Sequence, residues 1–111
     1  MTATLIDRST FGELQANAGA EFVVELLDTF AEEAPQILAE MRSALADGAA
    51  ERFRRAAHSL KSNSSTFGAS HLAEMARTLE LGGLPADAAP VDALAQEFER
   101  TLSALQELAR G

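Results

Sequence analysis

The chain has 111 residues, no cysteine and a formal net charge of −8, which suits one domain with a single core and excludes disulfide bonds and thiolate metal sites. The excess of carboxylates argues against nucleic-acid binding, which needs Lys and Arg side chains to neutralise phosphates. The first residues lack a basic, apolar leader and no apolar run approaches the roughly 20 residues of a membrane helix, so we expect a cytoplasmic protein without membrane contact.

Apolar residues recur at spacings of three and four, which indicates helices, and no stretch has the period of two that is typical of strands. A capping-box spacing over residues 10–13 predicts a short first helix that starts near Thr10 and ends around Gly19. The apolar pattern then continues over residues 20–47. Because its phase survives across Pro35, we expect one long, kinked helix rather than two helices.

A third helix is expected over residues 50–67 and a fourth over residues 69–81, with Gly68 between them. A Gly-Gly-Leu-Pro run ends the fourth helix. The last helix begins near Pro90, and its near-heptad apolar spacing suits antiparallel packing. The predicted fold is therefore all-α, an antiparallel four-helix bundle with a short additional N-terminal helix, in a single domain over residues 1–111.

The third predicted helix presents a histidine to solvent. A helical wheel gathers its apolar and small side chains into one narrow stripe, which comprises Phe53, Ala57, Leu60, Ser64 and Phe67. His58 lies roughly 140° from Phe53, so burial of the stripe leaves the imidazole exposed. An exposed imidazole is partly unprotonated at neutral pH and is then a nucleophile. Lys61, three residues on, lies within reach of a group attached to the ring.

The motif that contains this histidine covers residues 56–69, Ala-Ala-His-Ser-Leu-Lys-Ser-Asn-Ser-Ser-Thr-Phe-Gly-Ala. It resembles the signature of histidine-containing phosphotransfer (HPt) domains, which reads roughly A-H-x-L-K-G/S-x-(S/A)-x-x-(φ)-G-A. His58 matches the histidine that accepts a phosphoryl group, and Lys61 matches the lysine beside it. Ser62 stands where many members have glycine, and Asn63 where a small residue is more usual. The predicted helices agree with the family over nearly the whole chain.

The resemblance implies a phosphorelay intermediate in a two-component signalling pathway. The Nε2 atom of His58 would accept the phosphoryl group of an aspartyl phosphate on a receiver domain and pass it to another receiver. Because phosphoryl transfer depends on positioning and charge stabilisation, His58 is expected to be indispensable and Lys61 to stabilise the phosphoryl oxygens. The implied partners are response-regulator receiver domains and a hybrid histidine kinase, with Mg²⁺ on the receiver and no cofactor on this chain.

Other chemistries fit the sequence less well. The chain has no glycine-rich phosphate loop, so we expect no ATP-dependent kinase activity of its own. Metal sites in helical bundles use Glu three residues before His, whereas Arg55 and Gly68 occupy those positions here, so no metal site is expected. The dimerisation domain of a histidine kinase typically has acidic and proline residues after its histidine, and Ser-Leu-Lys follows His58 instead. We expect a free-standing monomer.

The expected partner surface surrounds His58. The small side chains of Ser62 and Ser65 leave room for an approaching protein. For Arg54, one turn before the histidine, three roles stay open: contact with the phosphoryl group, contact with the partner, or solubility. Phe11 and Leu14 on the first helix are candidate apolar partner contacts, although such residues more often cap a core.

Basic residues gather near His58 although the chain as a whole is acidic. Five of the nine Lys and Arg residues lie between Arg42 and Lys61. Such a surface favours an acidic partner or a phosphoryl group. One rival interpretation remains, a helical adaptor that binds a receiver domain without phosphoryl transfer. The intact pair of His58 and Lys61 argues against it, because a pure binder needs no nucleophile.

Overall fold

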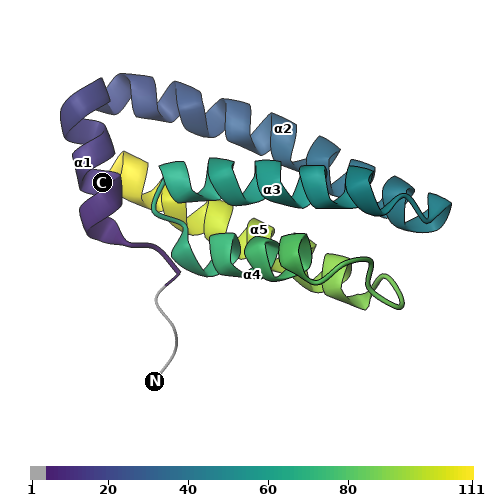
Figure 1. Cartoon of the computed structure of the whole chain (residues 1–111). Helices are drawn as coiled ribbons and strands as arrows, with labels where there is room; N and C mark the ends of the chain where they lie inside the picture. The colour runs from purple at the N-terminus through teal and green to yellow at the C-terminus, as the bar shows by residue number, and fades with distance from the viewer. Residues whose placement is uncertain (1–4) are drawn as a thin grey trace.

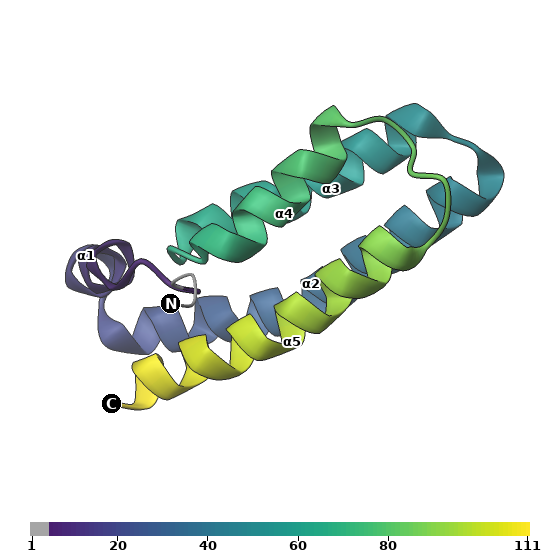
Figure 2. The ribbon, with the colours of Figure 1, turned by 90° about the horizontal axis from the view of Figure 1, so that it is seen from below.

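The computed structural model describes residues 5–111, which fold into helices joined by turns and include no strand. The helices are α1 (Arg8–Ala18), α2 (Ala20–Asp47), α3 (Ala50–Thr66), α4 (Ser70–Leu81) and α5 (Ala89–Arg110). Figure 1 shows α2 to α5 lying side by side along one axis, whereas α1 crosses the end of the bundle at which α5 ends. The view from below in Figure 2 shows the same arrangement, with α1 seen end-on. The all-α bundle with a short leading helix is confirmed.

The first helix begins earlier than the sequence predicted. Its N-cap is Asp7, whose side-chain oxygen accepts hydrogen bonds from the backbone N–H groups of Ser9 at 3.0 Å and Thr10 at 3.3 Å. The predicted start near Thr10 is therefore two residues too late. A carboxylate at the N-terminus of a helix accepts hydrogen bonds from free N–H groups and is attracted to the positive end of the helix dipole. Asp7 is therefore a better cap than Thr10.

The second helix continues through Pro35 as one element, as its unbroken apolar phase predicted. Pro35 is exposed, so its ring faces solvent rather than the core. The helix ends at Gly48, whose backbone N–H donates to Leu45 O at 3.2 Å. The following turn is short, and α3 therefore runs back along α2.

The core fills the space between α2, α3, α4 and α5, and α1 closes one end. Phe30 is buried in it, with its ring centroid 5.2 Å from that of Phe67 and 5.3 Å from that of Phe98. The contact with Phe98 is edge-to-face, an arrangement that aromatic quadrupoles favour. This cluster joins α2 and α5 to the end of α3. It fixes the end of the α3 helix relative to its neighbours.

Gly68 turns the chain from α3 into α4 and packs against the start of α1. The N–H group of Asp7 donates to Gly68 O at 2.6 Å. A Cβ atom at Gly68 would meet Asp7 O at 2.6 Å and Thr10 Cβ at 3.0 Å, so the position has no room for a side chain. The Phe-Gly-Ala part of the motif is therefore a structural joint. It sets the register between α3 and α4, whose residues then face one another across the hairpin.

Within residues 5–111, no helix has an apolar stretch long enough to cross a membrane.

Candidate functional site

The exposed face of α3 carries the histidine, as the helical wheel predicted. Every residue of the predicted stripe is at most 4% exposed. Ser64, the polar member, is satisfied because its hydroxyl donates to Leu60 O at 2.7 Å. The side chain of His58 is 52% exposed on the opposite face. Burial of the stripe therefore orients the imidazole outward, and a second protein can reach it.

A carboxylate from the neighbouring helix holds the imidazole in place. Glu80, in the last turn of α4, has an oxygen, Oε2, 2.8 Å from His58 Nδ1. Its other oxygen, Oε1, lies 3.2 Å from Lys61 Nζ. The Glu80 side chain is only 10% exposed, whereas that of His58 is about half exposed. One nearly buried carboxylate therefore connects the histidine and the lysine that the motif had singled out.

The charge of Glu80 determines which ring nitrogen carries the proton. The hydrogen bond with His58 lowers the pKa of the Glu80 carboxyl; burial acts in the opposite direction, and the ion pair with Lys61 lowers the pKa further. Glu80 is therefore ionised at neutral pH, and an ionised carboxylate can only accept hydrogen bonds. His58 Nδ1 must then donate, so in the neutral ring the lone pair is on Nε2. The nucleophilic atom is the one that points away from Glu80.

Glu80 is the site residue that the sequence reasoning missed. It lies 22 residues after His58 and on another helix, so helical periodicity does not connect the two. A weak signal was present, because His58 lies ten residues before Gly68 and Glu80 twelve residues after it. In an antiparallel hairpin, residues at similar distances from the turn face each other. An acidic residue at that distance was the available clue.

Arg54 also reaches this site. It donates from Nε to Glu51 Oε1 at 3.0 Å and from Nη2 to Glu51 Oε2 at 2.7 Å. Its third nitrogen, Nη1, lies 3.9 Å from Glu80 Oε2, the oxygen that holds the imidazole. Arg54 and His58 therefore both lie near the same oxygen of Glu80, but the hydrogen bonds of Arg54 are made with Glu51.

The structure places the remaining predicted residues in two regions. Ser62 and Ser65 are exposed on α3, on the same outer part of the helix as His58. Phe11 is only 3% exposed because its ring packs into the core, and Leu14 is partly buried against that core. The expectation that Phe11 offers an exposed partner contact is corrected by this burial. Both residues cap the end of the bundle from α1.

The expectation of a local basic surface also needs correction. Arg52 is paired with Glu40 and with Asp47, each at 2.9 Å, and these two hydrogen bonds raise the pKa of its guanidinium. Arg54 and Lys61 are likewise paired with carboxylates. Arg55 differs, because no ion pair joins it to any other residue between positions 5 and 111. Most of the positive charge near the histidine is therefore neutralised within the chain.

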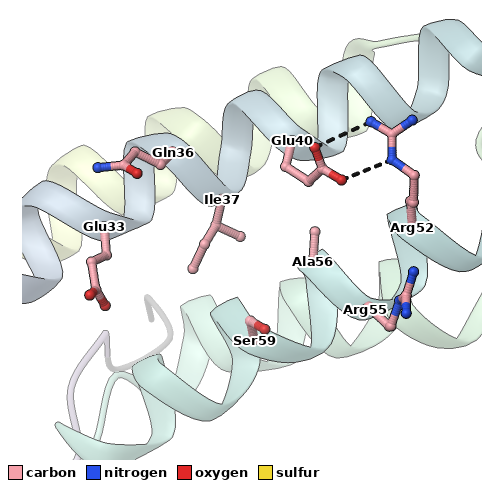
Figure 3. A pocket seen from close by; sticks show the side chains of 8 residues that line it. All are labelled: Glu33, Gln36, Ile37, Glu40, Arg52, Arg55, Ala56 and Ser59. Atoms are coloured by element: carbon pink, nitrogen blue, oxygen red, sulfur yellow. Dashed lines mark hydrogen bonds and ion pairs between the residues drawn. The ribbon is translucent and has the colours of Figure 1, made fainter.

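A groove of about 470 Å³ runs between α2 and α3 beside the site. Its lining comprises Glu33, Gln36, Ile37, Glu40, Arg52, Arg55, Ala56 and Ser59. Figure 3 shows Ile37 and Ala56 pointing into the space between the helices, with the Arg52–Glu40 pair near one end and Glu33 near the other. Ser59 follows His58 directly in the chain. The groove therefore opens next to the histidine, on the side away from Glu80.

Comparison with known proteins places this geometry in a family. The family model described as Hpt domain matches residues 25–108. The crystal structure of histidine-containing phosphotransfer protein B (HptB) from Pseudomonas aeruginosa PAO1 is similar, with a TM-score of 0.75 and 31% sequence identity over 98% of this chain and 94% of that chain. No curated protein matches the sequence significantly. The chain therefore belongs to the Hpt domain family, whose role is histidine phosphotransfer in phosphorelays.

Proposed function

We propose that this protein is a phosphorelay intermediate in which Nε2 of His58 accepts a phosphoryl group from an aspartyl phosphate of one receiver domain and passes it to another. The observation that carries the proposal is the hydrogen bond of 2.8 Å between His58 Nδ1 and Glu80 on an exposed helix face. It keeps the proton on the inner nitrogen and leaves the outer nitrogen as the nucleophile. Family membership supports the same reaction.

The transfer step needs no proton to leave the histidine. Nε2 attacks phosphorus, a P–N bond forms, and the P–O bond to the receiver aspartate breaks with its electron pair leaving on the carboxylate. Because Nδ1 keeps its proton, the ring becomes positively charged as the bond forms. The Glu80 carboxylate stabilises that charge, as the aspartate of a serine-protease triad stabilises its imidazolium. Transfer to the next receiver reverses these steps.

The chain supplies only part of the machinery in this proposal. The aspartate and the Mg²⁺ belong to the receiver, so this protein needs neither a cofactor nor ATP. The expected partners are response-regulator receivers and a hybrid histidine kinase. We propose that the protein works as a cytoplasmic monomer, because a single exposed histidine suffices for a relay.

We propose that the receiver approaches over the α2–α3 side of His58. Lys61, Arg54 and Glu80 occupy the α4 side, where their ion pairs limit access to the ring. On the other side the exposed Ser62 leaves space, and the groove offers apolar contacts to a partner helix. Arg55, which lines that groove without an ion pair within residues 5–111, suits a carboxylate of the partner. Ser65 lies further along the same exposed face.

The test uses receiver domains from the genome that encodes this protein, each phosphorylated on aspartate with radiolabelled acetyl phosphate. We expect at least one of them to transfer its label to the intact protein within minutes. The labelled protein should lose its label in acid and keep it in alkali, as a P–N bond requires. Stable complexes that form without any transfer of label would instead identify a helical adaptor, and the proposal would be rejected.

Lys61→Ala is expected to slow transfer by about fivefold, because one cation near the phosphoryl oxygens at a partly exposed site contributes about 1 kcal/mol. Lys61→Arg keeps the charge and should retain most of the rate. Initial rates of label transfer from a phosphorylated receiver measure both variants. Kinetics of Lys61→Ala that equal those of the wild type would remove Lys61 from the site.

Glu80→Ala is expected to release the ring and to slow transfer by about tenfold, the size of effect seen when a residue that orients a metal-binding imidazole is lost. Glu80→Gln keeps an oxygen that accepts a hydrogen bond from Nδ1–H but loses the negative charge, so its rate should lie between those of wild type and Glu80→Ala. Long-range ¹H–¹⁵N NMR of the imidazole should show the Nδ1–H tautomer in the wild type and a mixture in Glu80→Ala. The same tautomer in both proteins would contradict this role of Glu80.

A further inference from the structure

The ion pair between Glu51 and Arg54 lies on the same face of α3 as the histidine. Arg54 is one turn before His58, and Glu51 is one turn before Arg54. Two of the three guanidinium nitrogens donate to the two oxygens of Glu51 at 3.0 and 2.7 Å. The third lies 3.9 Å from Glu80 Oε2, to which His58 Nδ1 is also hydrogen-bonded. Glu51 therefore holds Arg54 in an ion pair, and Arg54 and the imidazole both lie close to the same Glu80 oxygen.

The ion-paired charges around the imidazole are balanced before a phosphoryl group arrives. Two carboxylates, Glu51 and Glu80, face two cations, Arg54 and Lys61. The hydrogen bond from Arg54 lowers the pKa of the Glu51 carboxyl, and nearby Arg55 contributes in the same direction, so Glu51 remains ionised at neutral pH. A phosphoryl group adds between one and two negative charges and three strong acceptor oxygens. It must therefore compete with these carboxylates for Arg54 and for Lys61.

Arginine is the better of the two cations for such a group. Its planar guanidinium donates two parallel hydrogen bonds to phosphoryl oxygens, whereas a lysine acts as a point charge. Arg54 makes that two-bond contact with Glu51 in the unphosphorylated protein. Both side chains are about half exposed or more, at 47% for Arg54 and 65% for Glu51, so their contact can open without disturbing the core.

We propose that Glu51 is a positioning residue that withholds Arg54 from the phosphoryl group on His58, and that this competition limits the stability of the phosphohistidine. The inference rests on the proposed function, since it concerns the phosphorylated form of the same site. Arg54 is then a second cation, besides Lys61, that contacts the phosphoryl group, and it does so only for the part of the time in which Glu51 releases it. A phosphohistidine that is incompletely stabilised passes its group on more readily, which suits an intermediate.

The test charges His58 with phosphoramidate, a small P–N donor that needs no partner protein, and follows the phosphohistidine by ³¹P NMR as the pH is varied. A nearby cation lowers the pH midpoint at which the phosphoryl group ionises. We expect Glu51→Gln to lower this midpoint by about 0.5 and Arg54→Ala to raise it, as ion pairs at exposed positions predict. In the Arg54→Ala background, Glu51→Gln should have less than half of that effect, because no arginine remains to be released.

The matched control is Glu13→Gln on α1, which removes the same charge from an exposed position at the end of the bundle and should leave the midpoint unchanged. Glu51→Gln with no effect, or with an equal effect in both backgrounds, would overturn the inference, because Glu51 would not act through Arg54. If His58 is still phosphorylated in these variants, either of those two outcomes leaves the proposed relay function intact. Failure of His58 to take up phosphoryl groups from both phosphoramidate and receivers would overturn the inference and the proposed function together.

Discussion

Replacing His58 with glutamine is expected to reduce label transfer from a phosphorylated receiver by at least about a thousandfold, because an amide nitrogen is not a nucleophile. Glutamine is similar in length, and its amide N–H can donate to Glu80 in place of Nδ1. The histidine side chain is half exposed and contributes nothing to the buried stripe. The far-ultraviolet circular dichroism spectrum and the melting temperature should therefore stay close to those of the wild type. The loss of transfer then reports chemistry rather than folding.

His71→Gln is the matched control for this experiment. It makes the same chemical change in the other histidine of the chain, at the start of α4, where the side chain is partly buried. We expect it to transfer label at the wild-type rate. Full transfer by His58→Gln, or its loss in His71→Gln alone, would show that the acceptor is another residue. The comparison also removes any general effect of losing an imidazole.

The helices were predictable from the sequence because most of their signals are local. The apolar phase of α2 continues through Pro35, and the structure has one helix there. The start of α1 was not predicted correctly, because two residue patterns competed for the cap. The spacing of Thr10 and Glu13 fits a capping box, but Asp7 supplies a carboxylate that accepts two backbone N–H groups. Sequence spacing alone does not rank these two caps.

The site was predictable only as far as one helix reaches. His58 and Lys61 lie three residues apart on α3, so a helical wheel places them together. Glu80 comes from α4, and its contact with both depends on the register of the α3–α4 hairpin. The ion pairs that neutralise Arg52 depend in the same way on the packing of α2 against α3. Charges counted along a sequence therefore overestimated the free positive charge near the histidine.

The register of the hairpin thus matters for the chemistry. One helical turn corresponds to about 5.4 Å along the axis, which is more than the reach of the hydrogen bond between His58 and Glu80. If α4 were shifted by one turn along α3, Glu80 could no longer contact His58 or Lys61. Gly68 lies at the hairpin turn and contacts α1 through Asp7. The short leading helix, which lies at the end of the bundle, therefore contributes to the site through this joint.

Gly68→Ala is expected to destabilise the protein by about 2–4 kcal/mol, the sum of two effects. Its φ of 75° lies in the left-handed region that residues with a Cβ disfavour. The added Cβ would also lie 2.6 Å from Asp7 O and 3.0 Å from Thr10 Cβ, so α1 must move. Urea unfolding followed by circular dichroism measures the change in free energy. The same variant should transfer phosphoryl groups more slowly, because movement at the turn alters how Glu80 meets His58.

Gly83→Ala separates the two effects. Gly83 has the same φ of 75°, but a Cβ there meets nothing within 4 Å. This variant should lose only the conformational part, about 1 kcal/mol, and should keep its transfer rate. The difference in stability between the two alanine variants then measures the contact between Gly68 and α1. Equal losses in both would show that α1 yields freely to the added methyl group, and that the joint does not fix the hairpin that brings Glu80 to His58.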